Sequence, residues 1–331
     1  MKEVQLVGQS LPFLEAVEKA SRASGADRPV LVVGERGTGK ELIAERLHHL
    51  SPRWRGPLVA LNCAALPETL IEAELFGHEA GAFTGAARAR AGRFEEADGG
   101  SLFLDELGTL SMAAQERLLR AVEYGEVTRI GASRPLKVDV RIIGATNDDL
   151  PHAVETGRFR ADLLDRLSFE VITLPPLRAR DGDVPLLADH YGRRMARECG
   201  WADWPGFAEE AEAALAAHDW PGNVRELRNV VERAVHAWPE PERAIGALVF
   251  DPFASPWRPV AKREGAAVPD AVAAAPAQEE VTDLRAALHA HEAAILTRTL
   301  ERHRFNQRAT AKALSLSYDQ LRHCLRRHGL L

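Results

Sequence analysis

Short apolar runs alternate with helical patterns through the first half of this 331-residue chain. Five runs are predicted to be buried strands, at residues 29–33, 58–61, 101–104, 138–145 and 169–174. The segments between them have helical patterns, and strands that alternate with helices favour a parallel α/β sheet. No apolar run is long enough to span a bilayer, so membrane insertion is not expected.

The strand signal stops after Pro175 and Pro176. Residues from about 183 to 237 have a helical pattern with breaks near 200–206 and 220–222, which predicts a separate helical subdomain. A stretch rich in proline and alanine then predicts a linker. The predicted organisation is an α/β subdomain, a helical subdomain, a linker and a C-terminal helical domain, at residues 1–174, 175–252, 253–281 and 282–331.

The charge of the chain is unevenly distributed. Residues 282–331 carry nine Lys or Arg and four Asp or Glu, a balance of +5, although the whole chain has a net charge of −6. A basic domain on an acidic body indicates that the C-terminal domain contacts nucleic acid, although basic tails can simply be solvated. The three cysteines are scattered without CxxC spacing and no signal peptide is evident, so we expect a reducing, cytoplasmic location.

A glycine-rich segment follows the first predicted strand and precedes a helix predicted over residues 41–50. It reads Gly34-Glu35-Arg36-Gly37-Thr38-Gly39-Lys40. In this context the glycines let backbone N–H groups wrap phosphates, the helix N-terminus adds positive potential, and the lysine reaches the β and γ phosphates. A plain glycine-rich turn is the alternative. Glu41 stands where such loops usually carry a Ser or Thr ligand for Mg²⁺.

The third predicted strand ends in two carboxylates, Asp105 and Glu106. We expect Asp105 to hold Mg²⁺ through water and Glu106 to orient or deprotonate the water that attacks ATP. A solvated pair at a strand end is the alternative. Thr146 and Asn147 end a neighbouring strand and are candidates to contact the γ-phosphate, with a plain polar strand end as the alternative. Asn62, at the end of the second strand, is a candidate to hold Glu106 inactive through a side-chain hydrogen bond.

Between these two motifs lies the segment Gly81-Ala82-Phe83-Thr84-Gly85-Ala86. It resembles the GAFTGA loop of sigma-54-dependent transcription activators, the bacterial enhancer-binding proteins. Its two glycines frame a loop whose tip is expected to expose Phe83 and Thr84 as a contact surface. The alternative is a buried turn in which Phe83 is a plug. Further segments that resemble the same family lie at residues 34–41, 61–65, 74–79, 92–100, 159–167 and 220–227.

The resemblance implies a AAA+ P-loop NTPase with a parallel sheet core and a helical lid, which binds ATP and Mg²⁺. It implies a homo-hexameric ring with ATP at the subunit interfaces, and sigma-54 RNA polymerase as the partner that is remodelled. Arg160 and Arg166 resemble the family's arginine fingers, which reach the γ-phosphate of a neighbouring subunit. The alternative for Arg166 is a pair with Asp162 on one helix face.

Arg225 resembles the sensor II arginine, which contacts the nucleotide from the lid. Asn223 is predicted to cap the helix that carries it, and Glu226 to complete a capping box.

The ATPase domain is expected to begin at about Val4, without a regulatory domain before it. Among activators of this kind the chain resembles the phage-shock type, which is restrained in trans by phage shock protein A. Trp54 resembles the exposed tryptophan of that docking patch. The alternative is a half-buried indole packed on the stems of Arg53 and Arg55. Further segments shared with the phage-shock type lie at residues 51–57, 124–126, 204–207 and 251–253.

The last fifty residues predict three helices with the spacing of a Fis-type helix-turn-helix. Leu284, Leu288, Ile295, Leu296 and Leu300 form the apolar stripe of the first helix. In the second, Ala309, Ala313 and Leu314 are expected to face inward. The third helix, residues 318–327, is the expected recognition helix, and Leu321 and Leu325 pack inward. The side chains left to contact enhancer DNA are Tyr318, Gln320, Arg322, His323 and Arg326, some of them at phosphates alone.

These features favour a sigma-54-dependent activator whose ATPase opens promoters. The alternative from another class is a DNA-bound repressor with a vestigial ATPase domain, against which the intact Lys40, Asp105 and Glu106 argue. The GAFTGA-like loop disfavours a AAA+ unfoldase or helicase loader.

Overall fold

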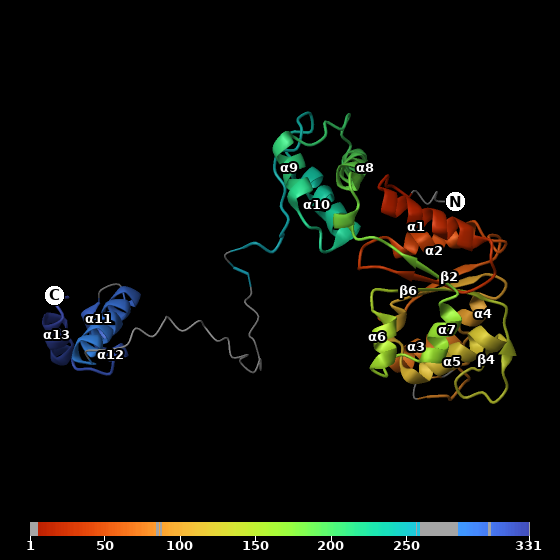
Figure 1. The fold of residues 1–331 in the computed structure, drawn as a ribbon, viewed down its shortest axis with the longest axis horizontal. Coiled ribbons are helices and arrows are strands. Elements are labelled where there is room, and N and C mark those ends of the chain that lie inside the picture. Colours follow the sequence, from red (N-terminus) through yellow and green to blue (C-terminus); the bar gives the residue numbers. More distant parts are fainter. Residues whose placement is uncertain are drawn as a thin grey trace. The chain divides into compact units, whose positions relative to one another are not determined.

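The computed structural model describes residues 6–83, 86, 88–255, 257–258, 284–303 and 306–330, with some side chains of the helix after 284 left out. The chain divides into two compact units, Met1–Ala254 and Ser255–Leu331, and each is described by itself (Figure 1). The predicted linker at 253–281 lies mostly outside the described residues.

The core of the first unit is a five-stranded sheet. Its strands are β1 (Val30–Val33), β2 (Leu58–Asn62), β3 (Ser101–Asp105), β6 (Arg141–Thr146) and β7 (Glu170–Thr173), in the order β2-β3-β6-β1-β7. All four pairings are parallel, which confirms the predicted parallel α/β sheet. A two-stranded antiparallel pair, β4 (Glu126–Val127) and β5 (Leu136–Lys137), was not predicted, since two residues are too few to show a period.

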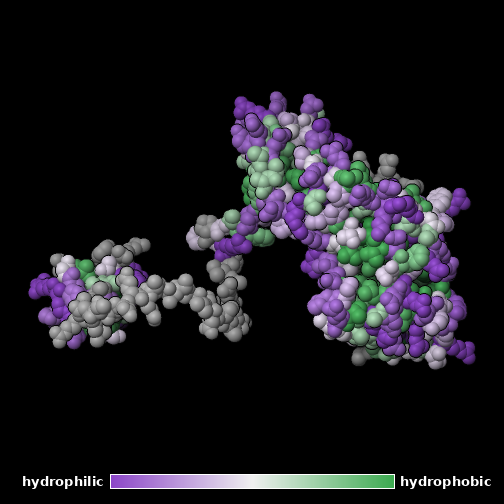
Figure 2. Space-filling model, in the orientation of Figure 1, coloured by the Kyte–Doolittle hydropathy of each residue, from purple (hydrophilic) through white to green (hydrophobic). Residues whose placement is uncertain are grey.

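Helices cover both faces of this sheet. The helices α1 (Leu11–Ser24) and α2 (Lys40–His49) lie on one face, and α3 (Glu68–Phe76), α5 (Met112–Tyr124) and α7 (Ala161–Leu167) lie on the other (Figure 1). Alternate residues of a strand pack into the hydrophobic cores on opposite faces of the sheet. Phe103 packs on the side of α1 and α2, whereas Leu102 and Leu104 pack on the other side. The short helices α4 (Arg93–Glu96) and α6 (Leu150–Glu155) complete this layer. Figure 2 shows polar side chains over most of the visible surface, with apolar side chains gathered toward the middle of the unit.

The helical part of the first unit contains α8 (Asp183–Glu198), α9 (Glu209–Ala217) and α10 (Asn223–Ala237). The two loops between them fall at the breaks expected from the pattern. Trp220, 1% exposed, packs in the centre of this cluster, and its indole N–H donates to the Leu215 carbonyl at 3.0 Å. A parallel sheet core with a helical lid is thereby in place.

The described part of the second unit consists of α11 (Leu284–Arg302), α12 (Gln307–Ala313) and α13 (Tyr318–Arg327). Ser317 caps α13 through a reciprocal pair of hydrogen bonds with Gln320. As expected, Leu296, Leu300, Leu321 and Leu325 are buried.

The structure corrects other expectations for this unit. Ile295 is 42% exposed, so it does not belong to the buried stripe of α11. In α12 the buried residues are Thr310 and Ala311, while Ala313 is exposed. A helix of two turns has too few apolar positions to define its inner face from sequence. The side chains of Leu284 and Leu288 lie outside the described set.

Across the described residues, no helix combines the length and apolar character needed to cross a membrane.

Candidate functional site

The glycine-rich segment joins β1 to α2 and forms a tight loop. Gly37 and Gly39 have φ values of +78° and +102°, a backbone region that favours glycine. A side chain at Gly37 would also collide with the lid, because an added Cβ would lie 2.3 Å from the Gly222 carbonyl oxygen. The loop therefore needs glycine both for its own conformation and for the close approach of the lid.

Lys40 begins α2 and curls back into this loop. Its Nζ donates to the carbonyls of Gly34 at 2.9 Å and Glu35 at 3.3 Å. Burial lowers the pKa of Lys40, while the carboxylates of Asp105 and Glu106 oppose the shift. The Lys40 ammonium therefore lies near the carboxylates of Asp105 and Glu106 and next to the loop that would hold phosphate oxygens.

A pocket of about 200 Å³ gathers most of the predicted nucleotide-binding residues. It is lined by the loop, by the acidic pair at the end of β3, and by lid side chains from α8 and α10. The lining residues are Arg36, Gly37, Gly39, Lys40, Glu41, Leu42, Asp105, Glu106, Tyr191, Val224, Arg225 and Arg228. Sequence reasoning missed Tyr191, Val224 and Arg228, because no local motif marks a lid residue that faces a loop more than 150 residues away.

Other predicted nucleotide contacts lie outside this lining. The Thr38 hydroxyl donates to the Glu35 carbonyl at 2.8 Å, and Gly34 and Glu35 also do not line the pocket. Thr146 is fully buried, and its hydroxyl accepts from the Asp148 N–H at 2.9 Å. Asn147 instead lines a separate cavity of about 690 Å³, together with Gly34 and Glu35.

Asp105 and Glu106, at the end of β3, make different contacts. The Asp105 carboxylate accepts from the Glu106 N–H at 3.0 Å, and Glu106 leaves the strand with a φ of +54°. Glu106 then lies 3.6 Å from the Arg36 guanidinium.

The expected contact between Asn62 and Glu106 is corrected by this geometry. The Asn62 amide donates to Asp105 at 3.4 Å, and its oxygen accepts from the Ala64 N–H at 2.9 Å. The reason is the register, since Asn62 lies directly opposite Asp105 in the β2–β3 pair.

The two candidate arginine fingers lie at the start of α7 and within it, and neither lines the pocket of its own chain. Arg160 precedes the helix and forms a two-pronged pair with Asp162, at 2.7 and 3.0 Å. Arg166 pairs with Glu123 of α5 at 2.6 Å. The alternative pairing of Arg166 with Asp162 is therefore wrong, because Arg160 already occupies that carboxylate.

The start of α10 differs from the predicted capping box. Gly222 is the residue before the helix, and its N–H donates to Glu226 at 2.7 Å. Asn223 has a φ of +53°, and its side chain points away from the helix toward the glycine-rich loop, where it bonds to Glu35 and Arg36. The capping prediction for Asn223 is wrong because the left-handed backbone turns its side chain outward.

The GAFTGA-like loop is described at its base. Gly81, with a φ of +81°, donates to the Ala86 carbonyl at 2.8 Å. Phe83 is 39% exposed and its ring stacks on His78 with 5.0 Å between centroids. Ala82 is half-buried and Ala86 is buried. Thr84 and Gly85 lie outside the described residues. The described part of the loop thus presents an aromatic ring that is not a buried plug.

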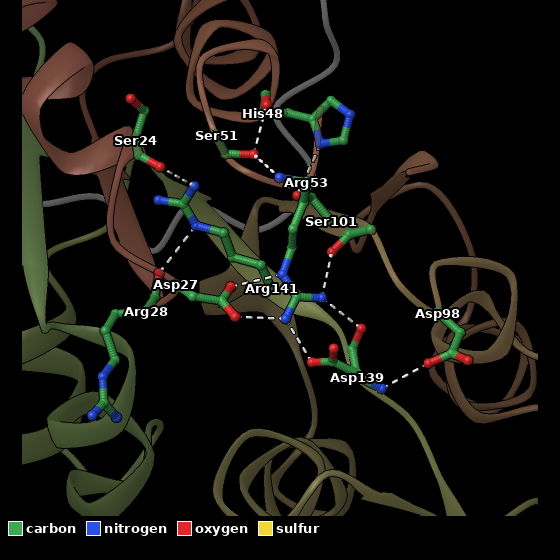
Figure 3. A network of polar contacts seen from close by, with 11 residues as sticks. Ser24, Asp27, Arg28, His48, Ser51, Arg53, Asp98, Ser101, Asp139 and Arg141 are labelled. Atoms are coloured by element: carbon green, nitrogen blue, oxygen red, sulfur yellow. Dashed lines mark hydrogen bonds and ion pairs between the residues drawn. The ribbon is translucent and has the colours of Figure 1, made fainter. Parts of the chain in front are cut away.

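Trp54 is 50% exposed in the segment before β2. The Arg55 guanidinium lies 4.8 Å from the centre of the indole. Arg53 binds Asp27 and Asp139 instead (Figure 3). The guanidinium of Arg55 lies over the indole, and half of the indole surface remains open.

The five candidate DNA contacts on α13 are all exposed. Two of them also hold the helix in place, because Gln320 accepts from the Ser317 N–H at 2.8 Å and the Tyr318 hydroxyl donates to Gln307 at 3.2 Å. Among the five, Arg322, His323 and Arg326 are the exposed basic candidates of this helix.

Comparison with known proteins places this geometry in a family. Residues 6–173 match the Sigma-54 interaction domain, and residues 178–250 match the AAA+ ATPase lid domain. The Psp operon transcriptional activator of Escherichia coli (strain K12) is 49% identical over 327 residues, which are 98% of both chains. The anaerobic nitric oxide reductase transcription regulator NorR of Klebsiella pneumoniae (strain 342) is 44% identical over 98% of this chain and 62% of its own length.

Among solved structures, NtrX from Brucella abortus in complex with ADP superposes with a TM-score of 0.69, at 30% identity, over 99% of this chain and 70% of that one. NtrX in complex with ATP superposes equally well, over 98% of this chain and 70% of its own. On this evidence the chain belongs to the sigma-54-dependent transcription activators of the AAA+ class, and within them it is close to the Psp operon transcriptional activator.

Proposed function

We propose that this sigma-54-dependent activator hydrolyses ATP as a homo-hexameric ring and uses the energy to convert the closed sigma-54 RNA polymerase complex to the open complex. One observation carries the proposal. Lys40, Asp105 and Glu106 line a single pocket together with Arg225 from the lid, although these residues come from distant parts of the sequence. A loop for phosphates, a cation, a metal-binding carboxylate and a general base are the parts that phosphoryl transfer requires.

The residues of the pocket fit a nucleotide with Mg²⁺. Among the described residues no cluster of three or more His, Cys, Asp or Glu could form a protein-only metal site. Mg²⁺ fits such a site because it is usually held by one or two carboxylates together with phosphate oxygens and water. Asp105 would hold the ion, which would neutralise charge on the phosphates. Glu106 would orient the attacking water and accept its proton.

The remaining candidate residues receive roles in the assembly. Arg160 and Arg166 would reach the γ-phosphate bound by the neighbouring subunit. To do so, Arg160 would release Asp162 and Arg166 would release Glu123. Arg225 would contact the nucleotide from the lid. The loop 81–86 would contact the polymerase, which is supported by the exposure of Phe83.

The C-terminal domain and Trp54 are assigned to DNA binding and to regulation. The helical domain at 282–331 would bind enhancer DNA through α13 and so raise the local concentration of the ATPase near the promoter. Trp54 would be the contact for a negative regulator that resembles phage shock protein A. The similarity to the Psp operon activator and the half-open indole support this role, and they favour the phage-shock operon as the target.

The test is transcription in vitro from a sigma-54 promoter, with ATP and with a non-hydrolysable analogue. We expect open complexes with ATP but not with the non-hydrolysable analogue. Lys40→Ala protein should form none with either nucleotide. Specific DNA binding without ATP turnover or open complexes would instead favour a repressor with a vestigial ATPase domain.

A further inference from the structure

Asn223 is the first residue of α10, and it is fully buried. Its φ of +53° lies in the left-handed region, which glycine, asparagine and aspartate tolerate better than other residues. A polar side chain held in this way needs partners for all of its hydrogen-bonding groups.

The Asn223 carboxamide joins three separate segments. Its oxygen accepts from the Leu177 N–H at 2.7 Å, in the segment that connects β7 to the lid. Its nitrogen donates to the Glu35 carboxylate and to the Arg36 carbonyl, each at 3.0 Å, in the phosphate-binding loop. One acceptor and two donors are therefore used, a combination that neither aspartate nor glycine can supply.

Glu35 is held from a second side as well. The Arg178 guanidinium, also in the segment between β7 and the lid, pairs with both oxygens of that carboxylate, one of them at 2.9 Å. The hydrogen bonds from Arg178 and then from Asn223 hold the pKa of Glu35 at about 2. Asp219 acts on Arg178, and the Lys40 ammonium bonds the Glu35 carbonyl. Arg36, Arg225 and Glu226 are further charged residues of the two contacting segments.

The lid tip and the loop are also in direct contact beside these hydrogen bonds. An added Cβ at Gly37 would lie 2.3 Å from the Gly222 carbonyl oxygen and 3.0 Å from the Arg225 side chain. Arg225 follows Asn223 by two residues and lines the nucleotide pocket, and Arg36 reaches Glu106 at 3.6 Å. A shift of Asn223 would thus move a lid residue and a loop residue of the pocket together.

We infer that Asn223 is a positioning residue: its carboxamide couples the lid to the phosphate-binding loop and so sets Arg225 and Arg36 for the nucleotide without touching the nucleotide itself. This role rests on the proposed ATPase function of the pocket. It gives Glu35 a purpose that the glycine-rich motif alone does not explain, since Glu35 does not line the pocket.

The test uses the full chain with Asn223→Asp, Asn223→Gly, Glu35→Gln and the double variant Asn223→Asp/Glu35→Gln. Affinity for a fluorescent ATP analogue and ATP turnover are measured from pH 8 to pH 5.5. Asn223→Asp keeps the backbone preference but sets a carboxylate against Glu35, so we expect at least a tenfold loss of affinity at pH 8. The loss should shrink toward pH 5.5, where the two carboxylates can share a proton.

Asn223→Gly should lose affinity with no such pH dependence. Glu35→Gln should restore much of the loss in the Asn223→Asp background, because the new amide can donate to the new carboxylate. Circular dichroism checks folding, and if Asn223→Asp protein does not fold, Arg178→Met tests the same junction from its other side through a loss of nucleotide affinity.

Affinity and turnover of Asn223→Asp protein equal to the wild type would overturn the inference, as would a loss that is independent of pH and not rescued by Glu35→Gln. The proposed ATPase function fails separately, if the wild type binds the analogue without turnover. In that case a rescued, pH-dependent binding defect would still support the coupling.

Discussion

Arg53 should be the residue that fixes the segment carrying Trp54. Its guanidinium donates to both carboxylate oxygens of Asp27, at 2.6 and 2.7 Å, and to the Asp139 carboxylate at 2.6 Å. A further bond at 2.8 Å reaches the Asp139 carbonyl. Figure 3 shows these contacts beside Arg141, which binds carbonyls at the end of α1. Arg53→Ala should therefore loosen the segment 51–57 without touching the nucleotide pocket.

The size of the effect follows from the exposure of the partners. The Arg53 side chain is 13% exposed, but Asp27 and Asp139 are 55% and 78% exposed, so solvent screens both pairs. An exposed ion pair contributes about 0.2–1 kcal/mol, and the two-pronged geometry with Asp27 favours the upper end. Loss of the buried stem adds about 1 kcal/mol. We expect Arg53→Ala to lower the free energy of unfolding by about 2–3 kcal/mol.

The assay is equilibrium unfolding in urea followed by circular dichroism. Arg55→Ala is the matched control, since Arg55 lies on the exposed indole and should cost less than about 0.5 kcal/mol. Equal effects of the two substitutions, or a loss below about 0.5 kcal/mol for Arg53→Ala, would refute the reasoning.

The pair with Asp27 also has a pH signature. The hydrogen bond from Arg53 lowers the pKa of Asp27 below its ordinary value of 3.8. A carboxylate with a depressed pKa stabilises the fold above its unfolded pKa and loses that contribution as the pH falls through the folded value. The difference between wild type and Arg53→Ala should therefore be constant near neutral pH and shrink below about pH 4.

Four further outcomes test the assignments. Glu106→Ala should still bind ATP but lose hydrolysis, and near-normal turnover would remove Glu106 from the mechanism. Thr84→Ala should hydrolyse ATP yet fail to form open complexes, as permanganate footprinting would show; open complexes at the wild-type level would sink the loop assignment. Trp54→Ala should keep its ATPase activity and escape inhibition by purified phage shock protein A, and equal inhibition of both proteins would place control elsewhere. Asp183→Ala removes a buried acceptor of three hydrogen bonds from the segment before α1, so urea unfolding should show a loss of about 3–5 kcal/mol; less than about 1 kcal/mol would contradict that role.

Much of the fold could be predicted from local pattern. The central strands β1, β3 and β6 contain apolar runs that are buried because helices cover both faces of a parallel sheet, and such runs stand out from the helical segments beside them. The edge strands β2 and β7 are only partly buried. The glycine-rich loop could be predicted for a similar reason, since its function depends on backbone conformation and on residues adjacent in sequence. The acidic pair at Asp105 and Glu106 was likewise visible, because it ends a strand.

Contacts between distant segments could not be predicted in this way. The sequence alone does not state that Asn62 lies opposite Asp105, because strand register is set when β2 and β3 pair. The sequence suggested Asp162 as a short-range partner for Arg166, but Arg166 binds Glu123 on another helix, 43 positions away. In both cases the partner expected from sequence was wrong: Glu106 lies one residue beyond the position opposite Asn62, and Asp162 is already paired with Arg160.

Asn223 shows the limit most clearly. From sequence it is a helix cap, because asparagine before a helical run usually bonds to the backbone of its own helix. In the structure its backbone is left-handed and its side chain bonds to Glu35, 188 residues away. Hydrophobic period and motif spacing thus determined which elements form and what chemistry they carry. The packing of the lid on the phosphate-binding loop decided which residues meet, because that depends on backbone angles and the path of the whole chain rather than on neighbours in sequence.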